Sequence, residues 1–525
     1  MDVHIRCPGP RPARIRNEES LHLLMSFRRL VGLGATLLAS ASLALPASAE
    51  TLQEAMASAY ATNPNLTAAR AGQRVTDETL VSEKFRVLPT VGGQVLLDQE
   101  TSDPGRFDDF SRLFNSTVQL RQPIYSFGRI RNSVKAADRS VLSGRAGLRA
   151  TENDVMLDVV TAYLDVLADQ SEVELTQNNV RVLERQLQAS SDRFEVGDVT
   201  RTDVAQSEAR LSLARSNFIA AQANLQTSRN FYAQVVGHAP RDLQPPPPLP
   251  TLPGSPDAAV DLALQNNPLV QASRLAEEAQ EYRVRAVRGQ RLPTLEATYD
   301  VGYTNYRGTN NSVGGLTFQN IDFTQNIGVT ATVPLFQRGQ VGSQIRSAKA
   351  RAVQLREDAL NAERQTIANV RTAYENLMAA RATIEAAETA ISANELALEG
   401  TRAELTVGTR NILDVLNAEQ ELLNAQVQLV RAERNSYVAA FALLASMGRA
   451  EVDDLGVPVR LYDAEGYLDR ADDHWFDWTA EFDAQPVTTE PMVSVPEPMA
   501  QPPLPDPTPT PPTEDEVLAT EADDR

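Results

Sequence analysis

Two copies of one pattern of motifs occupy most of the chain, and this duplication limits the folds that the chain can adopt. Motifs of the first copy recur at an offset of 204 residues near its start and of 211 residues further along. At the first offset the recurring motifs are Asn63-Pro64 with Asn267-Pro268 and Leu88-Pro89-Thr90 with Leu292-Pro293-Thr294; at the second they are Pro123 with Pro334, Val196-Gly197 with Val407-Gly408 and Asp203-Val204 with Asp414-Val415. The change of offset places seven additional residues between Thr294 and Pro334, where we expect an exposed turn.

Within each copy, apolar residues recur every seven positions. The positions are Val159, Val166, Val173, Val180, Leu187 and Phe194 in the first copy, and Val370, Leu377, Ile384, Ile391, Leu398 and Leu405 in the second. A sustained spacing of seven predicts helices packed as a coiled coil. The alternative is the core of an ordinary helical bundle, but the 67 residues from Ile130 to Val196 contain no proline. Such a stretch makes a helix about 100 Å long. After Gly197 the spacing resumes, so we expect the chain to turn there and pack back along itself.

A second periodicity, of two residues, marks four segments. Alternating apolar and polar residues predict strands at Leu295–Tyr303 and Ile321–Val333, and more weakly at Val91–Thr101 and Asn115–Gln122. A soluble half-buried sheet is one reading. The segments are close to the ~10 residues that a membrane strand needs, and aromatic residues surround them, which favours an outer-membrane barrel.

Four strands are too few to close a barrel, because the smallest membrane barrels have about eight. An open sheet edge in lipid leaves backbone groups without hydrogen bonds. We therefore expect several chains to share one barrel; this arithmetic permits a dimer or a trimer. The predicted fold class is mainly α with a membrane β-barrel, in which long coiled-coil hairpins accompany four strands per chain.

The N-terminal residues have the features of a secretory signal peptide. Arg28 and Arg29 precede an apolar stretch, and Ala47-Ser48-Ala49 forms a cleavage site before Glu50. The apolar stretch is shorter than a spanning helix needs, so a retained anchor is the weaker reading. Either Met1 or Met25 is the true start. The single cysteine, Cys7, lies before the cleavage site, which disfavours a lipid-anchored form.

Composition excludes several classes of function. One cysteine and four histidines in 525 residues leave no disulfide framework and no histidine-based catalytic or metal site. A formal charge of −20, with no basic patch standing out, disfavours a nucleic-acid partner. Motifs of hydrolases such as GxSxG and HExxH are missing from the sequence. We therefore expect neither an enzyme nor a bound cofactor, and an envelope hydrolase is the weakest alternative.

The expected organisation follows from these patterns. Residues 1–49 are an N-terminal extension and signal peptide, 50–240 the first repeat with its strand hairpin at 91–123, 241–256 a proline-rich linker, 257–450 the second repeat with its hairpin at 295–333, 451–484 a C-terminal segment and 485–525 an acidic tail with 11 prolines. Because proline cannot continue the helical seam, we expect the tail to be mobile and dispensable for assembly.

The combined features resemble the TolC family of outer-membrane efflux and type I secretion channels. The resemblance covers about residues 50 to 450 and rests on the signal peptide, the duplicated layout and the tips FEVGDVTRTDVAQSE (194–208) and LTVGTRNILDVLNAE (405–419). It implies a homotrimer with a 12-stranded barrel in the outer membrane and a helical tunnel in the periplasm. It also implies two partners, a periplasmic adaptor and an inner-membrane ABC exporter or proton-driven RND pump.

The resemblance also assigns residues at the two tips. It implies that Val196, Gly197, Val407 and Gly408 dock the adaptor, and that Thr202, Asp203, Arg410 and Asp414 hold the periplasmic entrance shut. We expect Arg410 to bond to Asp203 as a latch. Leu405 and Asn417 depart from the tyrosine and the acidic residue that relatives often have, which implies a looser gate. The alternative is that Thr202, Asp203 and Asp414 only cap helix starts.

Two further questions stay open. A periplasmic coiled-coil scaffold without channel activity is the alternative function, although it leaves the four strands unexplained. The exported substrate is undefined by the sequence, because a tunnel wall need only be polar.

Overall fold

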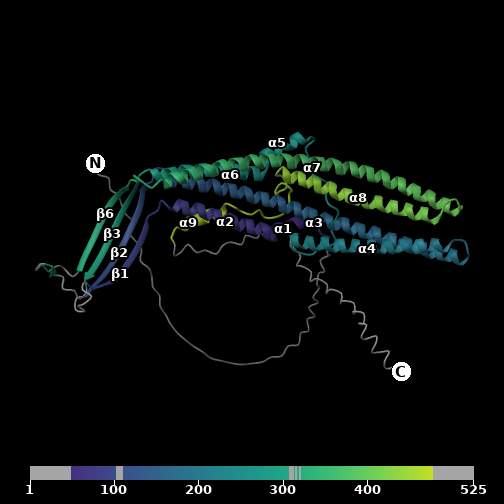
Figure 1. The fold of residues 1–525 in the computed structure, drawn as a ribbon, viewed down its shortest axis with the longest axis horizontal. Helices are drawn as coiled ribbons and strands as arrows, with labels where there is room; N and C mark the ends of the chain where they lie inside the picture. Colours follow the sequence, from purple (N-terminus) through teal and green to yellow (C-terminus); the bar gives the residue numbers. More distant parts are fainter. Residues whose placement is uncertain (1–48, 102–109, 307–311, 314–315, 318–320, 477–525) are drawn as a thin grey trace, which may run out of the picture. The chain divides into compact units, whose positions relative to one another are not determined.

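The computed structural model describes residues 49–101, 110–306, 312–313, 316–317 and 321–476 (Figure 1). The expected signal peptide up to Ser48 and the expected mobile tail at 485–525 lie outside the described residues.

The same order of elements occurs in both halves of the chain. The first half contains α1 (Leu52–Thr62), α2 (Pro64–Phe85), β1 (Thr90–Thr101), β2 (Phe110–Tyr125), α3 (Arg129–Glu195) and α4 (Arg201–Val236). The second half contains α5 (Pro256–Asn266), α6 (Pro268–Arg288), the short 3-10 helix η1 (Gly289–Arg291), β3 (Thr294–Tyr306), β4 (Ser312–Val313), β5 (Leu316–Thr317), β6 (Ile321–Thr332), α7 (Gln340–Thr406) and α8 (Ile412–Ser446), after which comes α9 (Gly466–Asp473). The small β4–β5 hairpin lies within the segment where seven additional residues predict a turn.

The recurring Asn-Pro motif has a structural reason in each half. Asn63 caps α2, because its Oδ1 accepts a hydrogen bond from the Asn65 backbone N–H at 2.9 Å, and Pro64 occupies the first helical position. The Asn63 Nδ2 donates to the Val235 carbonyl at 2.9 Å near the end of α4. Asn267 caps α6 in the same way and donates to the Ser446 carbonyl at 2.8 Å at the end of α8. The motif therefore both starts a helix and ties it to the end of the hairpin in its own half.

The two long helices confirm the coiled-coil prediction. α3 and α7 each contain 67 residues, and each packs against the helix that follows it, α4 or α8. Val159 and Val166 of the first seam and Val370 and Leu377 of the second are at most 1% exposed. Figure 1 shows both hairpin turns at the ends of the hairpins away from the strands. No helix among the described residues is long and apolar enough to span a membrane.

The four predicted strands form one antiparallel sheet in the order β1-β2-β3-β6. In this register Val91 lies opposite Leu120, Leu120 opposite Tyr299, and Tyr299 opposite Ile327, so these four side chains share one face. We call it the apolar face. The opposite, polar face carries the alternate residues, such as Thr298 and Asn326. Among the described segments of the chain, β1 and β6 each have only one neighbouring strand, so the sheet has two open edges.

The main core lies where α1, α3 and α4 of the first half meet α5, α7 and α8 of the second, and buried polar groups lie beside it. Glu50 accepts a 2.6 Å hydrogen bond from the Tyr232 hydroxyl, and its backbone carbonyl accepts one from the Tyr163 hydroxyl at 2.9 Å. Burial raises the pKa of the Glu50 carboxyl above its usual value. The segment after α8 adds to this core through Val452 and Val457 and contacts α1, because the Tyr462 backbone N–H donates to the Tyr60 hydroxyl at 3.1 Å.

Candidate functional site

The first tip is a tight turn between α3 and α4. α3 ends at Glu195, and Gly197 has a φ of 80°, in the left-handed region that glycine adopts without strain. The Asp198 backbone N–H donates to the Arg193 carbonyl at 2.9 Å, which closes the last turn of the helix. Val196 is 79% exposed at the apex. An apolar side chain is thus presented to solvent on a rigid turn.

The second tip repeats this geometry between α7 and α8. Gly408 has a φ of 78°, and the Thr409 backbone N–H donates to the Glu404 carbonyl at 3.0 Å. Val407 is 75% exposed. The four residues to which the family resemblance assigns adaptor docking therefore form two equivalent apolar apices, and docking itself stays a prediction.

An ion pair spans each turn, and its polarity is opposite in the two tips. In the first tip Arg193 Nε lies 2.8 Å from Asp198 Oδ2. In the second tip Glu404 Oε2 lies 2.8 Å from Arg410 Nε. Arg193 and Glu404 occupy equivalent positions at the offset of 211 residues. Roles for Arg193, Asp198 and Glu404 were not predicted from the sequence, although this offset aligns an arginine with a glutamate.

Asp203 forms part of the cap of α4. Thr200 is the N-cap residue: its Oγ1 accepts from the Asp203 backbone N–H at 3.3 Å, and the Thr200 backbone N–H donates to Asp203 Oδ2 at 2.8 Å. This reciprocal pair is a capping box. The alternative that Asp203 caps a helix start is thus present in the structure. Thr202, which was considered for the same role, lies in the first turn and is exposed, and Thr200 occupies the cap position instead.

Arg410 and Asp414 lie together at the start of α8. Asn411 caps this helix by accepting from the Asp414 backbone N–H at 3.0 Å. The Asp414 carboxylate is 3.8 Å from Arg410 Nη1, a weak contact beside the 2.8 Å pair with Glu404. Among the described residues of one chain, Arg410 therefore bonds to Glu404 and not to Asp203 as expected. The physical reason is local: Glu404 lies on the same turn and reaches Arg410 first.

The two hairpins contact each other just above the tips. Leu183 and Leu211 of the first hairpin pack in one apolar cluster with Ile412 and Leu416 of α8. Beside this cluster, Arg210 Nη2 donates to Asn417 Oδ1 at 2.7 Å. This link between hairpins was not predictable from the sequence, because the two residues lie 207 positions apart and belong to no shared motif.

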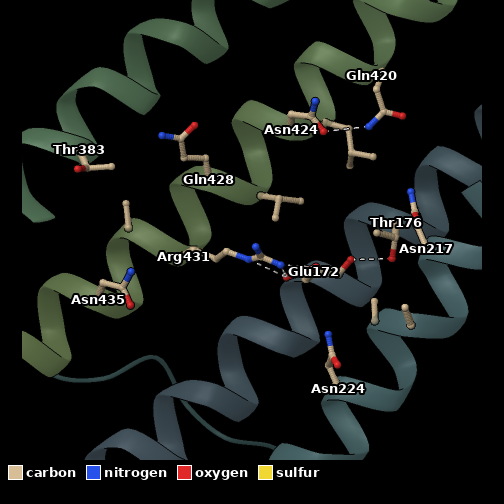
Figure 2. A pocket seen from close by; sticks show the side chains of 15 residues that line it. Glu172, Thr176, Asn217, Asn224, Thr383, Gln420, Asn424, Gln428, Arg431 and Asn435 are labelled. Atoms are coloured by element: carbon tan, nitrogen blue, oxygen red, sulfur yellow. Dashed lines mark hydrogen bonds and ion pairs between the residues drawn. The ribbon is translucent and has the colours of Figure 1, made fainter.

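Higher along the hairpins, a cavity of about 650 Å³ lies between α3, α4, α7 and α8 (Figure 2). Its wall is rich in amide side chains: Asn217, Asn224, Gln420, Asn424, Gln428 and Asn435. Figure 2 shows Arg431 reaching from α8 to Glu172 on α3, and the two groups are 2.9 Å apart. Nearby, Arg434 Nη2 lies 2.6 Å from Asp165 Oδ1, and both residues are half-buried. Three polar links thus join the hairpins of one chain.

These features define a class of protein in which long helical hairpins with exposed apolar tips are joined to a sheet that has one apolar face and two open edges. Comparison with known proteins gives the same class. The sequence model described as outer membrane efflux protein matches residues 55–238 and 259–449.

Individual relatives agree with this match. The outer membrane efflux protein BepC of Brucella suis biovar 1 (strain 1330) is 33% identical over 428 residues, covering 81% of this chain and 91% of the relative. The outer membrane protein TolC of Escherichia coli (strain K12) is 25% identical over 423 residues, covering 78% of this chain and 84% of the relative. Among solved structures, the Campylobacter jejuni CmeC outer membrane channel has the same fold, with a TM-score of 0.67 at 18% identity over 80% of this chain and 88% of that one.

The chain belongs to the outer membrane efflux protein family. The expected resemblance to the TolC family is confirmed. The protein is an export channel of the outer membrane, and its helical part lies in the periplasm.

Proposed function

We propose that three copies of this chain form a passive conduit, with no chemistry of its own, that carries cargo from the periplasm across the outer membrane. The observation that carries the proposal is the four-stranded sheet with two open edges and one apolar face. In a lipid environment the unpaired backbone N–H and C=O groups of β1 and β6 need hydrogen-bond partners. Pairing β1 of one copy with β6 of the next copy supplies these partners. Three copies give the twelve strands that the family resemblance implies.

The partners in this proposal are a periplasmic adaptor and an inner-membrane transporter, either an ABC exporter or an RND pump. The exposed valines of the two tips, Val196 and Val407, support a docking role, because apolar side chains on rigid turns are suited to burial in a partner surface. Each copy offers two such tips, so three copies offer six equivalent apices to the adaptor.

The entrance in this proposal is closed by polar contacts near the tips. Thr202, Asp203, Arg410 and Asp414 remain the proposed gate residues. We add to the proposed gate two contacts, the Arg210–Asn417 hydrogen bond and the Glu404–Arg410 ion pair. Three copies would bring carboxylates together around one entrance, where the positive charge of Arg410 in each copy offsets the repulsion between them. The proposed gate therefore opens when the transporter and the adaptor break these contacts.

The cargo stays undefined between drugs, metals and proteins. The amide-rich cavity between the hairpins supports a wall that interacts with hydrated cargo of many kinds, because amides donate and accept hydrogen bonds without a fixed charge.

The test compares two substitutions on adjacent residues of β6. Ile327 is 87% exposed on the apolar face, and Asn326 lies next to it on the polar face. An arginine on a lipid-facing strand costs about 2 to 4 kcal/mol at mid-membrane. We expect Ile327→Arg to abolish recovery of crosslinked trimers from outer membranes, and Asn326→Arg to leave trimers intact while changing conductance in planar bilayers.

Other outcomes would contradict the proposal. Crosslinking that yields only monomers or dimers would exclude a trimer. Unimpaired membrane extraction of Ile327→Arg, together with a lack of conductance for the unmodified protein, would favour the periplasmic scaffold instead.

A further inference from the structure

A cavity of about 630 Å³ lies where the strands of the first half meet the helices. Its lining combines an apolar shelf, which includes Ile124, Tyr125 and Val134, with three cations, Lys84, Arg131 and Lys135. α2 supplies Lys84, and the first two turns of α3 supply the other two. The cavity thus combines an apolar shelf with a group of positive charges.

The shelf is continuous with the apolar face of the sheet. Tyr125 lies opposite Leu295 of β3, and Leu295 is on the same face as Ala297 and Tyr299, the apolar face. Its ring also packs edge-on against Phe127, with the ring centroids 4.6 Å apart. Aromatic side chains at the end of a membrane strand mark the boundary between hydrocarbon and headgroups. The three cations therefore lie at headgroup level on the periplasmic side of the membrane.

Among the residues that the structure describes, carboxylates balance only one of these three cations. Lys84 forms an ion pair with Asp472 of α9. Lys135 Nζ lies 5.5 Å from the centre of the Tyr282 ring, a contact that leaves its charge in place. Within the described parts of the chain, Arg131 has no acidic partner. In a chain with a formal charge of −20, two uncompensated cations beside an apolar shelf fit an anionic ligand with an apolar body.

The second copy repeats this composition at its own junction of strand and helix. Lys84, Tyr125 and Lys135 correspond to Arg288, Phe336 and Arg346 at the two offsets. Phe336 is 85% exposed in the single chain. Both junctions also have the same backbone, because Phe127 and Arg338 each adopt a positive φ, of 47° and 50°, before a left-handed glycine.

Where the second copy differs, it retains a concentration of positive charge. Arg131 corresponds to Gly342, but a Cβ placed at Gly342 would lie 3.7 Å from Arg291 Nη2 and 3.6 Å from Arg346 Nη1. Two guanidinium groups therefore converge where the first copy has Arg131. Among the described residues neither has an acidic partner. We call the two sets, Lys84 with Arg131 and Lys135, and Arg288 with Arg291 and Arg346, the basic rim.

We propose that the basic rim binds the phosphate groups of anionic phospholipids in the inner leaflet of the outer membrane, with the acyl chains lying on the apolar shelf. Arginine and lysine donate charge-assisted hydrogen bonds to a phosphodiester, and each cation near an anionic membrane surface strengthens the attraction. A zwitterionic headgroup offers the same phosphate with its charge cancelled by the adjacent amine, so the rim prefers anionic lipid. The bound lipid fixes the depth of the barrel where it meets the helices.

The test is native mass spectrometry of the full-length assembled protein in mild detergent, with equal amounts of phosphatidylglycerol and phosphatidylethanolamine of identical acyl chains added. We expect retention of phosphatidylglycerol over phosphatidylethanolamine by the unmodified protein. The Arg131→Gln/Lys135→Gln variant should lower phosphatidylglycerol retention by about half, because the set of the second repeat remains, and leave phosphatidylethanolamine unchanged. The Arg291→Gln/Arg346→Gln variant should do the same.

Two controls keep the result specific. Arg181→Gln/Arg185→Gln removes two exposed cations from α3 about 75 Å from the rim and should retain as much lipid as the unmodified protein. Arg131→Lys/Lys135→Arg preserves the charges and should preserve the preference, also where the glutamine variant is unstable.

Three outcomes would overturn the proposal. These are equal retention of both lipids by the unmodified protein, full retention of phosphatidylglycerol by both glutamine variants, and loss of assembly by the glutamine variants to the same degree with and without phosphatidylglycerol. The last outcome would assign the cations to contacts between copies of this chain.

Discussion

Arg193 and Glu404 occupy the same position in the two repeats, yet each forms an ion pair of opposite polarity across its own tip. Arg193 pairs with Asp198, and Glu404 pairs with Arg410, each at 2.8 Å. Both tips have the left-handed glycine and the same closing hydrogen bond, whereas the charge at the equivalent positions 193 and 404 is opposite, and the partners Asp198 and Arg410 come from non-equivalent positions. A ring of alternating tips therefore presents alternating charge patterns to whatever docks there.

Arg410 is the residue through which this difference is most directly tested. We predict that Arg410→Ser raises single-channel conductance in planar bilayers, because Glu404 and Asp414 then repel each other and the acids of neighbouring copies. Glu404→Gln should have the smaller effect, since it leaves Arg410 free to pair with Asp414. Arg193→Ser, on the other tip, is the matched control and should leave conductance near the unmodified value. An unchanged conductance for Arg410→Ser would show that closure depends on helix packing and capping alone.

Asp414 and Asn417 are the residues through which cation binding at the proposed entrance can be tested. We predict that Asp414→Ala weakens block by multivalent cations, because it removes one carboxylate from each copy at the mouth. Asn417→Asp should strengthen the link to Arg210 by making the 2.7 Å hydrogen bond charge-assisted. The expected readouts are a higher blocking concentration for the first variant and a lower conductance for the second. A blocking concentration that Asp414→Ala does not change would remove Asp414 from the gate.

Substitutions can show whether the two tip glycines are needed for their backbone conformation or for the small size of their side chain. A Cβ at Gly197 or Gly408 would meet nothing within 4 Å, so only the left-handed backbone opposes a side chain. We predict that the double variant Gly197→Val, Gly408→Val loses export while assembly persists, because a β-branched residue is strained there. Asn tolerates this region, so Gly197→Asn, Gly408→Asn should retain most export. Equal export by the two double variants would show that the turn geometry does not matter for docking.

The periodic parts of the fold were predictable from sequence because periodicity is a local property. The proline-free stretch from Ile130 to Val196 became α3, Arg129–Glu195, within one residue at each end. The strands at 295–303 and 321–333 likewise became β3 and β6. In both cases the apolar spacing alone specifies which side chains share one face.

Contacts between distant segments were not predictable in this way. The partner of Arg410 depends on how a single turn folds, and the Arg210–Asn417 link requires two hairpins to meet. The basic rim shows the same limit: its cations are scattered between Lys84 and Arg346, so no basic run stands out in an acidic chain. Only the shared junction of strand and helix brings them together.

Glu152 links the C-terminal segment to α3 and makes stability depend on pH. Its Oε1 accepts a 2.9 Å hydrogen bond from the Val452 backbone N–H, and burial raises the pKa of its carboxyl from 4.5 to about 7. Nearby Glu451 also raises the pKa, whereas Arg70 and Arg149 lower it. The folded protein therefore holds a proton on Glu152 between about pH 4.5 and 7 that the unfolded chain releases.

Because the folded state binds more protons in this window, the contribution of Glu152 to stability is complete below about pH 4.5 and is lost as the pH rises to about 7. Glu152→Gln keeps the acceptor for Val452 and cannot ionise. We predict that the variant and the unmodified protein have similar free energies of unfolding at pH 4.5, and that at pH 8 the variant is more stable by about 3 kcal/mol. Urea denaturation followed by circular dichroism measures this difference, with the exposed Glu208→Gln as the control that should show no such trend. A difference between variant and unmodified protein that stays constant from pH 4.5 to 8 would mean that Glu152 is already ionised in the folded protein at the lower pH.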